Sequence, residues 1–241
     1  MRTLRKRKPL LKRVADKLDS ETLAIISAKD QKSEAHRRYS NARKAKWFES
    51  VVKELGELAG PGERCMFCSG SEASDVEHYK PKSVFPQLAM TWENYLWSCT
   101  PCNRGKLDRF PPDTGPGGRL INPLDENVWD FFFIDDFGLL TPRYDRQANT
   151  LNPRAVTTRD MLSLNRDALQ ISRKQRIENL KRDVYNCLKL MNLKKLTKKA
   201  ASEQVEIWKA ESWQPDVADF YLNGPGRKSS PFREFFEAIT V

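Results

Sequence analysis

Four of the five cysteines form two closely spaced pairs that could bind a metal ion. Cys65 and Cys68 make one C-x2-C motif, and Cys99 and Cys102 make another after thirty intervening residues. Two residues between cysteines let both sulfur atoms face one ion, and four thiolates leave no open coordination position. The spacing therefore predicts a structural Zn²⁺ site that joins the two ends of the thirty-residue segment. Two redox-active cysteine pairs are the alternative.

One of only two histidines lies between these pairs, directly after a carboxylate. His78 follows Glu77, and Asn103 follows the last paired cysteine. Histidine suits a general base near neutral pH, whereas a carboxylate and an amide oxygen suit a hard ion such as Mg²⁺ or Mn²⁺. These residue types match phosphodiester hydrolysis, in which a divalent ion stabilises the charge that develops on the phosphate and on the leaving oxygen.

Basic side chains surround this stretch and are candidates for binding nucleic-acid phosphates: Lys80, Lys82, Arg104 and Lys106. The formal net charge of +10 also favours a polyanionic partner. A solvated basic surface, or a surface for an acidic protein, explains the charge about equally well. The matching alternative for the site is a zinc ribbon that binds nucleic acid or protein without catalysis, in which His78 is a packing or surface residue.

Two strands and a helix are expected to position these residues. The alternation in "DVEHY" predicts a strand, "WENYLWSC" a second extended segment, and "NRGK" the opening of a helix. Clamped by zinc, these elements would bring Glu77, His78 and Asn103 close together. After them, the Pro- and Gly-rich segment 109–123 predicts a loop, and residues 128–144 predict short strands around a turn.

The N-terminal part is predicted to be a basic arm followed by helices. For residues 1–17 a flexible, solvated tail is favoured over an ordered nucleic-acid arm. Helical spacing over residues 20–58 predicts helices, with Ser20 as the N-cap and a break near Ser33 or Ser40. His36 in this stretch is expected to face solvent or to pack.

An apolar stripe predicts a long helix in the C-terminal half: Ile177, Leu180, Val184, Cys187, Leu188 and Met191. Cys187 lies on this stripe and is therefore expected to be a core thiol. Another helix is expected over residues 200–212. The sequence contains no apolar run of about 20 residues and no secretory signal, so the expected location is the cytoplasm.

Residues 65–106 resemble the motif of HNH (ββα-metal) endonucleases in its zinc-bound, four-cysteine form. The resemblance rests on "CMFC", "VEHYKPKS", "WENYLWSC" and "CNRGK". It implies that His78 is the general base and that Glu77 and Asn103 bind the catalytic divalent ion. It also places Asn94 at the middle Asn position, which orients the loop and the catalytic histidine. Asn103 stands where the motif has its final histidine, and Glu77 stands where Asp is more usual.

A wider similarity, over about residues 60–175, is to a bacterial HNH subfamily found with retrons and Septu-type anti-phage systems. It rests on "EHYKPKS", "NYLWSCTPCNRGK", "LINP" and "LSLNRDAL". It implies a DNA endonuclease that acts in defence with an ATPase partner. An RNA target is an alternative, because the metal chemistry acts on phosphate and the motif does not read the sugar. Double-strand cleavage would favour a homo-oligomer.

The expected fold class is α+β: a mainly α-helical chain with an embedded, zinc-stapled ββα-metal motif. The predicted parts are a basic arm (1–19), an N-terminal helical region (20–62), a nuclease core with the Pro- and Gly-rich loop (63–155), and a C-terminal helical region (156–241). The last part is a candidate surface for docking DNA or a protein partner.

Overall fold

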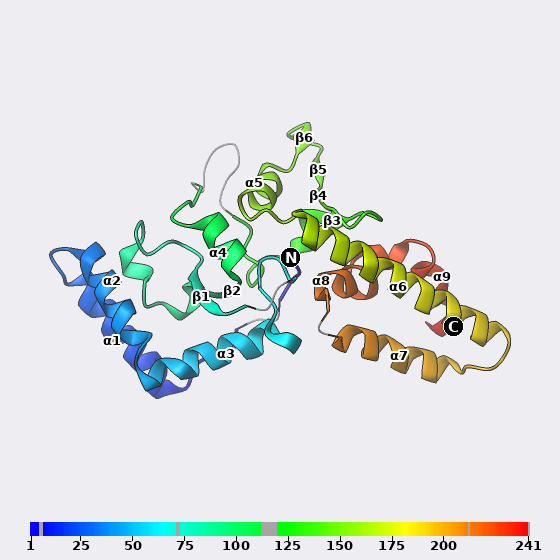
Figure 1. The fold of residues 1–241 in the computed structure, drawn as a ribbon, viewed down its shortest axis with the longest axis horizontal. Coiled ribbons are helices and arrows are strands. Elements are labelled where there is room, and N and C mark those ends of the chain that lie inside the picture. Colours follow the sequence, from blue (N-terminus) through cyan, green and yellow to red (C-terminus); the bar gives the residue numbers. More distant parts are fainter. Residues whose placement is uncertain (5–6, 71–72, 112–119, 212, 241) are drawn as a thin grey trace.

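The computed structural model describes residues 1–4, 7–70, 73–111, 120–211 and 213–240 (Figure 1). The fold is α+β, because helices dominate and the strands of the described residues pair into three small antiparallel sheets. The helices are α1 Lys12–Ile26, α2 Gln31–Ala42, α3 Glu49–Ala59, α4 Thr100–Lys106, α5 Pro153–Met161, α6 Asp167–Asn192, α7 Lys198–Ala210, α8 Pro215–Ala218 and α9 Phe232–Thr240. The strands are β1 Asp75–His78, β2 Tyr95–Ser98, β3 Phe132–Ile134, β4 Leu140–Pro142, β5 Tyr144–Asp145 and β6 Thr150–Leu151.

Helices α1, α2 and α3 lie at one end of the molecule, and α6, α7 and α9 lie at the other (Figure 1). The expected N-cap at Ser20 was wrong, since this residue lies inside α1. The expected break near Ser33 or Ser40 is confirmed: residues 27–30 separate α1 from α2 just before Ser33, and α2 ends at Ala42, just after Ser40. Asp30 caps α2, because its carboxylate accepts a hydrogen bond from the Ser33 N–H at 3.1 Å.

The described part of the basic N-terminal arm is packed, so the expectation of a flexible tail was wrong there. The Met1 α-amino group pairs with the Asp216 carboxylate at 3.1 Å, and both are fully buried. Arg7 donates a hydrogen bond to the carbonyl of Tyr95, and its guanidinium lies 4.9 Å from the centre of the Trp92 ring. The arm is ordered because its charged groups find partners far along the chain.

Strands β1 and β2 and helix α4 form the ββα unit between the two helical ends (Figure 1). The strands pair antiparallel in a register that sets His78 opposite Tyr95 and Glu77 opposite Leu96. Helix α4 starts directly after Cys99, and Pro101 lies in its first turn, where proline suits a helix. The strands and helix expected around the paired cysteines are therefore present, although the helix begins slightly earlier than "NRGK".

The C-terminal half follows the periodicity of the sequence. Strands β3 and β4 form the expected hairpin. The apolar stripe of α6 faces the core, and Cys187 is buried on it as expected. Residues 112–119 of the predicted loop lie outside the described residues. None of the helices in the described ranges is both long and apolar enough to cross a membrane.

Candidate metal centre and active site

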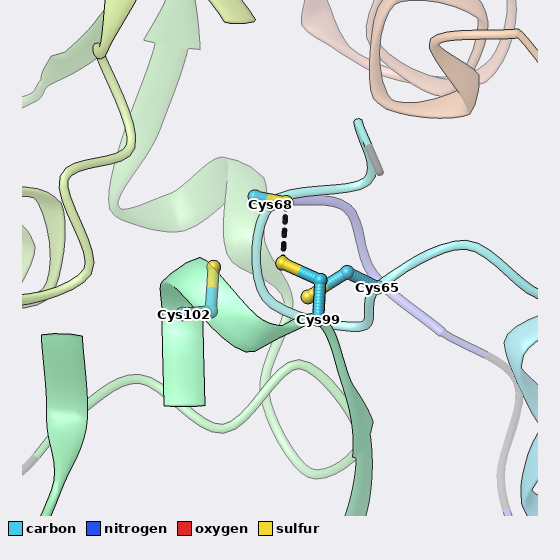
Figure 2. A group of neighbouring side chains, drawn as sticks. All are labelled: Cys65, Cys68, Cys99 and Cys102. Carbon is cyan, nitrogen blue, oxygen red and sulfur yellow. Dashed lines mark hydrogen bonds between the residues drawn. The ribbon is translucent and has the colours of Figure 1, made fainter. Parts of the chain in front are cut away.

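The four paired cysteines converge on one point (Figure 2). Their sulfur atoms all lie within 4.8 Å of one another, and all four residues are buried. Cys68 Sγ and Cys99 Sγ are 3.7 Å apart. Tetrahedral Zn–S bonds of about 2.3 Å place two sulfurs about 3.8 Å apart. The cluster therefore fits a metal ion such as zinc, and its convergence argues against two separate redox pairs.

Local backbone geometry brings the two cysteine pairs together. The first pair lies in a turn that the Ser69 N–H closes on the Cys65 carbonyl at 2.8 Å. The Met66 N–H donates to the Trp97 carbonyl at 2.9 Å, which fastens this turn to β2. Cys99 directly follows β2 and is the N-cap residue of α4, while the last cysteine lies in the first turn of that helix (Figure 2). One strand end and one helix start thus present the second pair to the first.

Arg166, just before α6, adds positive charge beside the cluster. Its Nη2 donates to Cys68 Sγ at 3.3 Å. Burial raises the pKa of the Cys65 thiol, so loading a metal has to displace protons from the sulfur atoms. A divalent ion with four thiolates has a net negative charge, which a neighbouring guanidinium offsets. Arg166 therefore links the C-terminal helices to the metal centre.

His78 ends β1 with its ring in a fixed orientation. Its Nε2 lies 2.9 Å from the Ala89 carbonyl oxygen, and the residue is only 4% exposed. A carbonyl can only accept a hydrogen bond, so Nε2 carries the proton and Nδ1 keeps its lone pair. Burial lowers the pKa of His78 to about 3, which keeps the ring neutral near pH 7.

Two tyrosines surround the His78 ring. The ring centres of Tyr39 and Tyr95 lie 4.5 Å and 5.3 Å from it, in edge-on arrangements. The Tyr95 hydroxyl donates to the same Ala89 carbonyl at 2.8 Å. The Tyr39 hydroxyl, from α2, donates to the Val76 carbonyl at 3.1 Å. These contacts leave the imidazole little freedom to rotate.

Asn94 joins the two ends of the segment that connects β1 to β2. Its Oδ1 accepts from the Lys80 N–H at 2.8 Å, and its Nδ2 donates to the Lys80 carbonyl at 2.9 Å. Nδ2 also donates to the Leu88 carbonyl at 3.0 Å, next to the residue whose carbonyl holds His78. The amide therefore fixes the path of the chain around the histidine.

Glu77 and Lys106 form a buried ion pair. Glu77 Oε1 lies 2.8 Å from Lys106 Nζ, and the Lys106 side chain is 0% exposed. Burial raises the pKa of Glu77 and lowers the pKa of Lys106, while their mutual attraction opposes both shifts. Lys106 is one of the residues that were predicted from the sequence to bind phosphate. The structure instead buries this side chain on Glu77, so it is not on the surface that a phosphate would meet.

The other predicted site residues lie around this pair. Asn103 is half-buried on α4, three residues before Lys106 and so on a neighbouring part of the same helix face. Arg104 is exposed. Lys82 Nζ lies 5.1 Å from the centre of the Tyr39 ring, and Lys80 Nζ lies 5.4 Å from the Phe85 ring. Within the described ranges, the four cysteines are the one group of three or more His, Cys, Asp or Glu side chains placed to share an ion.

Comparison with known proteins identifies two relatives, although no family model matches the chain. A Vibrio cholerae (serotype O1 biovar El Tor) protein, provisionally named as the HNH endonuclease of retron Vc95, is 35% identical over 126 residues. The match covers 49% of this chain and 60% of that protein. The Septu protein PtuB of Bacillus thuringiensis is 34% identical over 82 residues, which are 32% of this chain and 30% of PtuB.

These similarities support a retron- and Septu-associated HNH family. The chain spans less than two thirds of either relative, so the matches concern part of each protein. They agree with the resemblance that the cysteine pairs and the Glu-His pair suggested in the sequence.

Several contacts of this HNH-like site were missed by sequence reasoning. Tyr39 lies far from His78 in the sequence and gives no local signal. Tyr95 directly follows Asn94, so its place at the start of the predicted strand was a signal that could have found it. The Ala89 carbonyl is a backbone group, and the "LSLNRDAL" stretch that contains Arg166 gives no sign that this side chain lies beside the cysteines. Long-range packing alone brings these groups to the site.

Proposed function

We propose that this chain is a metal-dependent HNH endonuclease that hydrolyses phosphodiester bonds of DNA in anti-phage defence. The strongest support is the orientation of His78, whose Nε2–H is bound to the Ala89 carbonyl so that Nδ1 keeps the lone pair that a general base needs. The relatives from a retron and from a Septu system support the same assignment.

The cysteine cluster would hold a structural Zn²⁺. Four thiolates close the coordination sphere, so this ion would have no position for a substrate. Its effect would be to fix the turn at Cys65 against the junction of β2 and α4. Through the pairing of β1 with β2, the cluster would hold His78 in register with Tyr95.

In the proposed reaction, His78 Nδ1 takes a proton from the attacking water. The Ala89 carbonyl keeps the ring oriented and stabilises the imidazolium that forms. Asn94 acts as a positioning residue for the segment that carries Ala89. Because His78 is almost fully buried, substrate binding has to bring water to Nδ1.

Glu77 and Asn103 would hold the catalytic ion, Mg²⁺ or Mn²⁺. One carboxylate and one amide suit Mg²⁺, which keeps several waters and takes further oxygen ligands from substrate phosphate. The bound ion would supply stabilisation of the charge on the leaving oxygen. Glu77 is paired with Lys106, so its carboxylate has to share or release this ammonium when the ion binds.

The remaining parts of the proposal concern assembly. The division into an arm (1–19), a helical region (20–62), a nuclease core (63–155) and a C-terminal region (156–241) is proposed as the functional organisation. The C-terminal region would dock an ATPase partner or DNA, in the cytoplasm. A homo-oligomer would be needed if the protein cuts both strands with one site per chain.

The deciding experiment is a plasmid-cleavage assay with Mg²⁺ or Mn²⁺. His78→Ala is expected to lower the cleavage rate by about 10²- to 10⁴-fold, the usual contribution of a general base. Zinc content and the circular dichroism spectrum should match the wild type. A variant that cuts at the wild-type rate contradicts the mechanism. Cleavage of RNA but not plasmid would retain the chemistry and reassign the substrate.

The second candidate is a zinc module that binds nucleic acid or a protein without catalysis. The Glu77–Lys106 pair favours it, because the proposed metal ligand already has a partner within the chain. This candidate predicts salt-sensitive binding but no metal-stimulated cleavage by the wild-type protein. The plasmid assay therefore separates the two candidates.

A further inference from the structure

A hollow of about 460 Å³ lies between α2 and the segment that follows β1. Its lining residues are polar or charged: Lys32, Ser33, His36, Lys82, Ser83 and Asp108. They come from α2, from the segment after β1 and from the residues just after α4. Two of these parts, α2 and the segment after β1, also contact His78 through Tyr39 and the Ala89 carbonyl.

One face of α2 runs from this hollow to the candidate base. Lys32, His36 and Tyr39 are spaced four and three residues apart, so they lie on one side of the helix. The first two are exposed, and Tyr39 is buried against the His78 ring, 4.5 Å away between ring centres. Lys82 lies over the Tyr39 ring at 5.1 Å and also lines the hollow. The hollow is therefore continuous with the surroundings of His78.

Two kinds of side chain in the lining have no partner among the described residues. Its cations form no ion pair, and one of its hydroxyl groups makes no hydrogen bond. Within the described ranges, neither Lys32 nor Lys82 forms an ion pair. Asp108 is the acidic residue of the lining. The Ser83 hydroxyl is buried and has no hydrogen-bond partner in the same ranges. A buried hydroxyl that lacks a partner costs free energy, which an acceptor oxygen on a ligand would recover. These features suit an anion with several oxygen atoms.

We propose that this hollow binds the sugar-phosphate backbone of duplex DNA beside the phosphodiester bond that is cleaved at His78. The inference rests on the proposed nuclease function and extends it to residues of α2. Lys32 and Tyr39 are seven residues apart, a rise of about 10 Å along the helix. DNA advances about 3.4 Å per nucleotide along one strand. For a duplex that runs along α2, the proposed Lys32 contact is to a phosphate about three nucleotides from the cleaved bond.

The test measures binding without cleavage. Fluorescence anisotropy of a labelled DNA duplex is followed in the His78→Ala background without added divalent ions. One phosphate contact contributes a slope of about 0.9 to a plot of log K against log salt concentration. Over the decade from 1 M to 0.1 M salt this slope corresponds to about eightfold in K, so Lys32→Gln is expected to weaken binding about eightfold at 0.1 M salt. The slope itself should fall by about 0.9.

Lys53→Gln in the same background is the matched control. Lys53 is also an exposed helical lysine, on α3, and it does not line the hollow. The change removes the same charge but no proposed contact, so it should leave affinity and slope nearly unchanged. Equal effects of the two lysine variants would overturn the proposal.

Asp108→Asn tests the sign of the interaction. Removing this acid from the lining is expected to tighten DNA binding about two- to fivefold, the range of a surface charge interaction. Two results together would show that no polyanion enters the hollow. These are an affinity of Asp108→Asn equal to that of its parent and an affinity of Lys32→Gln equal to that of the control. A Lys32 effect on duplex RNA and not on DNA would overturn the choice of DNA.

The binding and cleavage assays distinguish a failure of the proposed binding site from a failure of the proposed nuclease function. Loss of affinity in Lys32→Gln with no plasmid cleavage by the wild-type protein would refute the nuclease and retain the hollow as a binding site. Cleavage that depends on His78, with Lys32→Gln binding like the control, would retain the nuclease and refute the hollow. All of the lysine and aspartate changes are at exposed positions, and circular dichroism checks that folding is intact.

Discussion

Buried polar groups have different kinds of partner in the C-terminal helices and in the ββα unit. In the C-terminal helices, Arg173 is fully buried and its Nε donates to the Asp216 carboxylate at 2.9 Å, which also binds the Met1 amino group. One carboxylate therefore pairs with two basic groups within the chain. In the ββα unit, four buried thiols face one another, and His78 Nδ1 keeps a lone pair.

This difference distinguishes residues that stabilise the fold from residues that form the candidate site. A buried charge that has its partner within the chain, as Arg173 does, holds the fold together, whereas four converging thiols suit an external cation. The cysteines illustrate the same contrast. Cys187 is alone on the apolar face of α6, while the paired cysteines form a cluster that only a cation would satisfy.

The largest expected effect comes from breaking the cysteine cluster. Cys102→Ser should lower bound zinc from about one ion per chain to nearly none and unfold the ββα unit. A structural zinc contributes about 10–16 kcal/mol in zinc-finger peptides, comparable with the whole stability of a domain. Metal analysis and thermal melting measure the change. Cys187→Ser is the control and should keep its metal; retention of zinc by Cys102→Ser would show that the cluster is not a metal site.

A smaller effect is expected from the C-terminal ion pairs. Asp216→Asn should cost about 3–5 kcal/mol of unfolding free energy, because Arg173 stays buried without its counter-charge. Zinc content should not change. Urea unfolding measures the loss, with Asp160→Asn as the control at an exposed surface pair. If both variants lose similar stability, the buried pair does not have the proposed structural role.

The smallest effect is the pH dependence that His78 contributes. Its pKa is about 3 in the folded chain against a model-peptide value of 6.5, so the unfolded chain takes up the proton first. Stability is therefore complete above pH 6.5 and is lost as the pH falls toward 3. Between pH 7 and pH 5 the loss is about 2 kcal/mol.

Urea unfolding at several pH values measures this loss. His78→Gln should have a flatter profile than the wild type by that amount, whereas His36→Gln, which changes the exposed histidine, should follow the wild type. Parallel profiles for wild type and His78→Gln would mean that the ring is not held neutral by burial.

Sequence reasoning recovered the parts of the site that depend on short-range pattern. The cysteine spacing, the strand around Glu77 and His78 and the stripe of α6 follow local rules, and the structure agrees with them. The errors have a common cause. Lys106 looked like a surface cation because local sequence does not reveal burial, and the first helix was started at Ser20 because a capping residue can also lie inside a helix.

The sequence by itself determined the chemical inventory: two thiol pairs, one histidine beside a carboxylate, and a basic surface. Spacing of two or three residues sets which side chains one turn can present, so these features can be read without a fold. Only the tertiary structure decided that Tyr39 and the Ala89 carbonyl hold His78, that Lys106 binds Glu77, and that α2 extends the site into a hollow. These contacts join elements distant in the sequence, and they form because burying apolar surface brings those elements together.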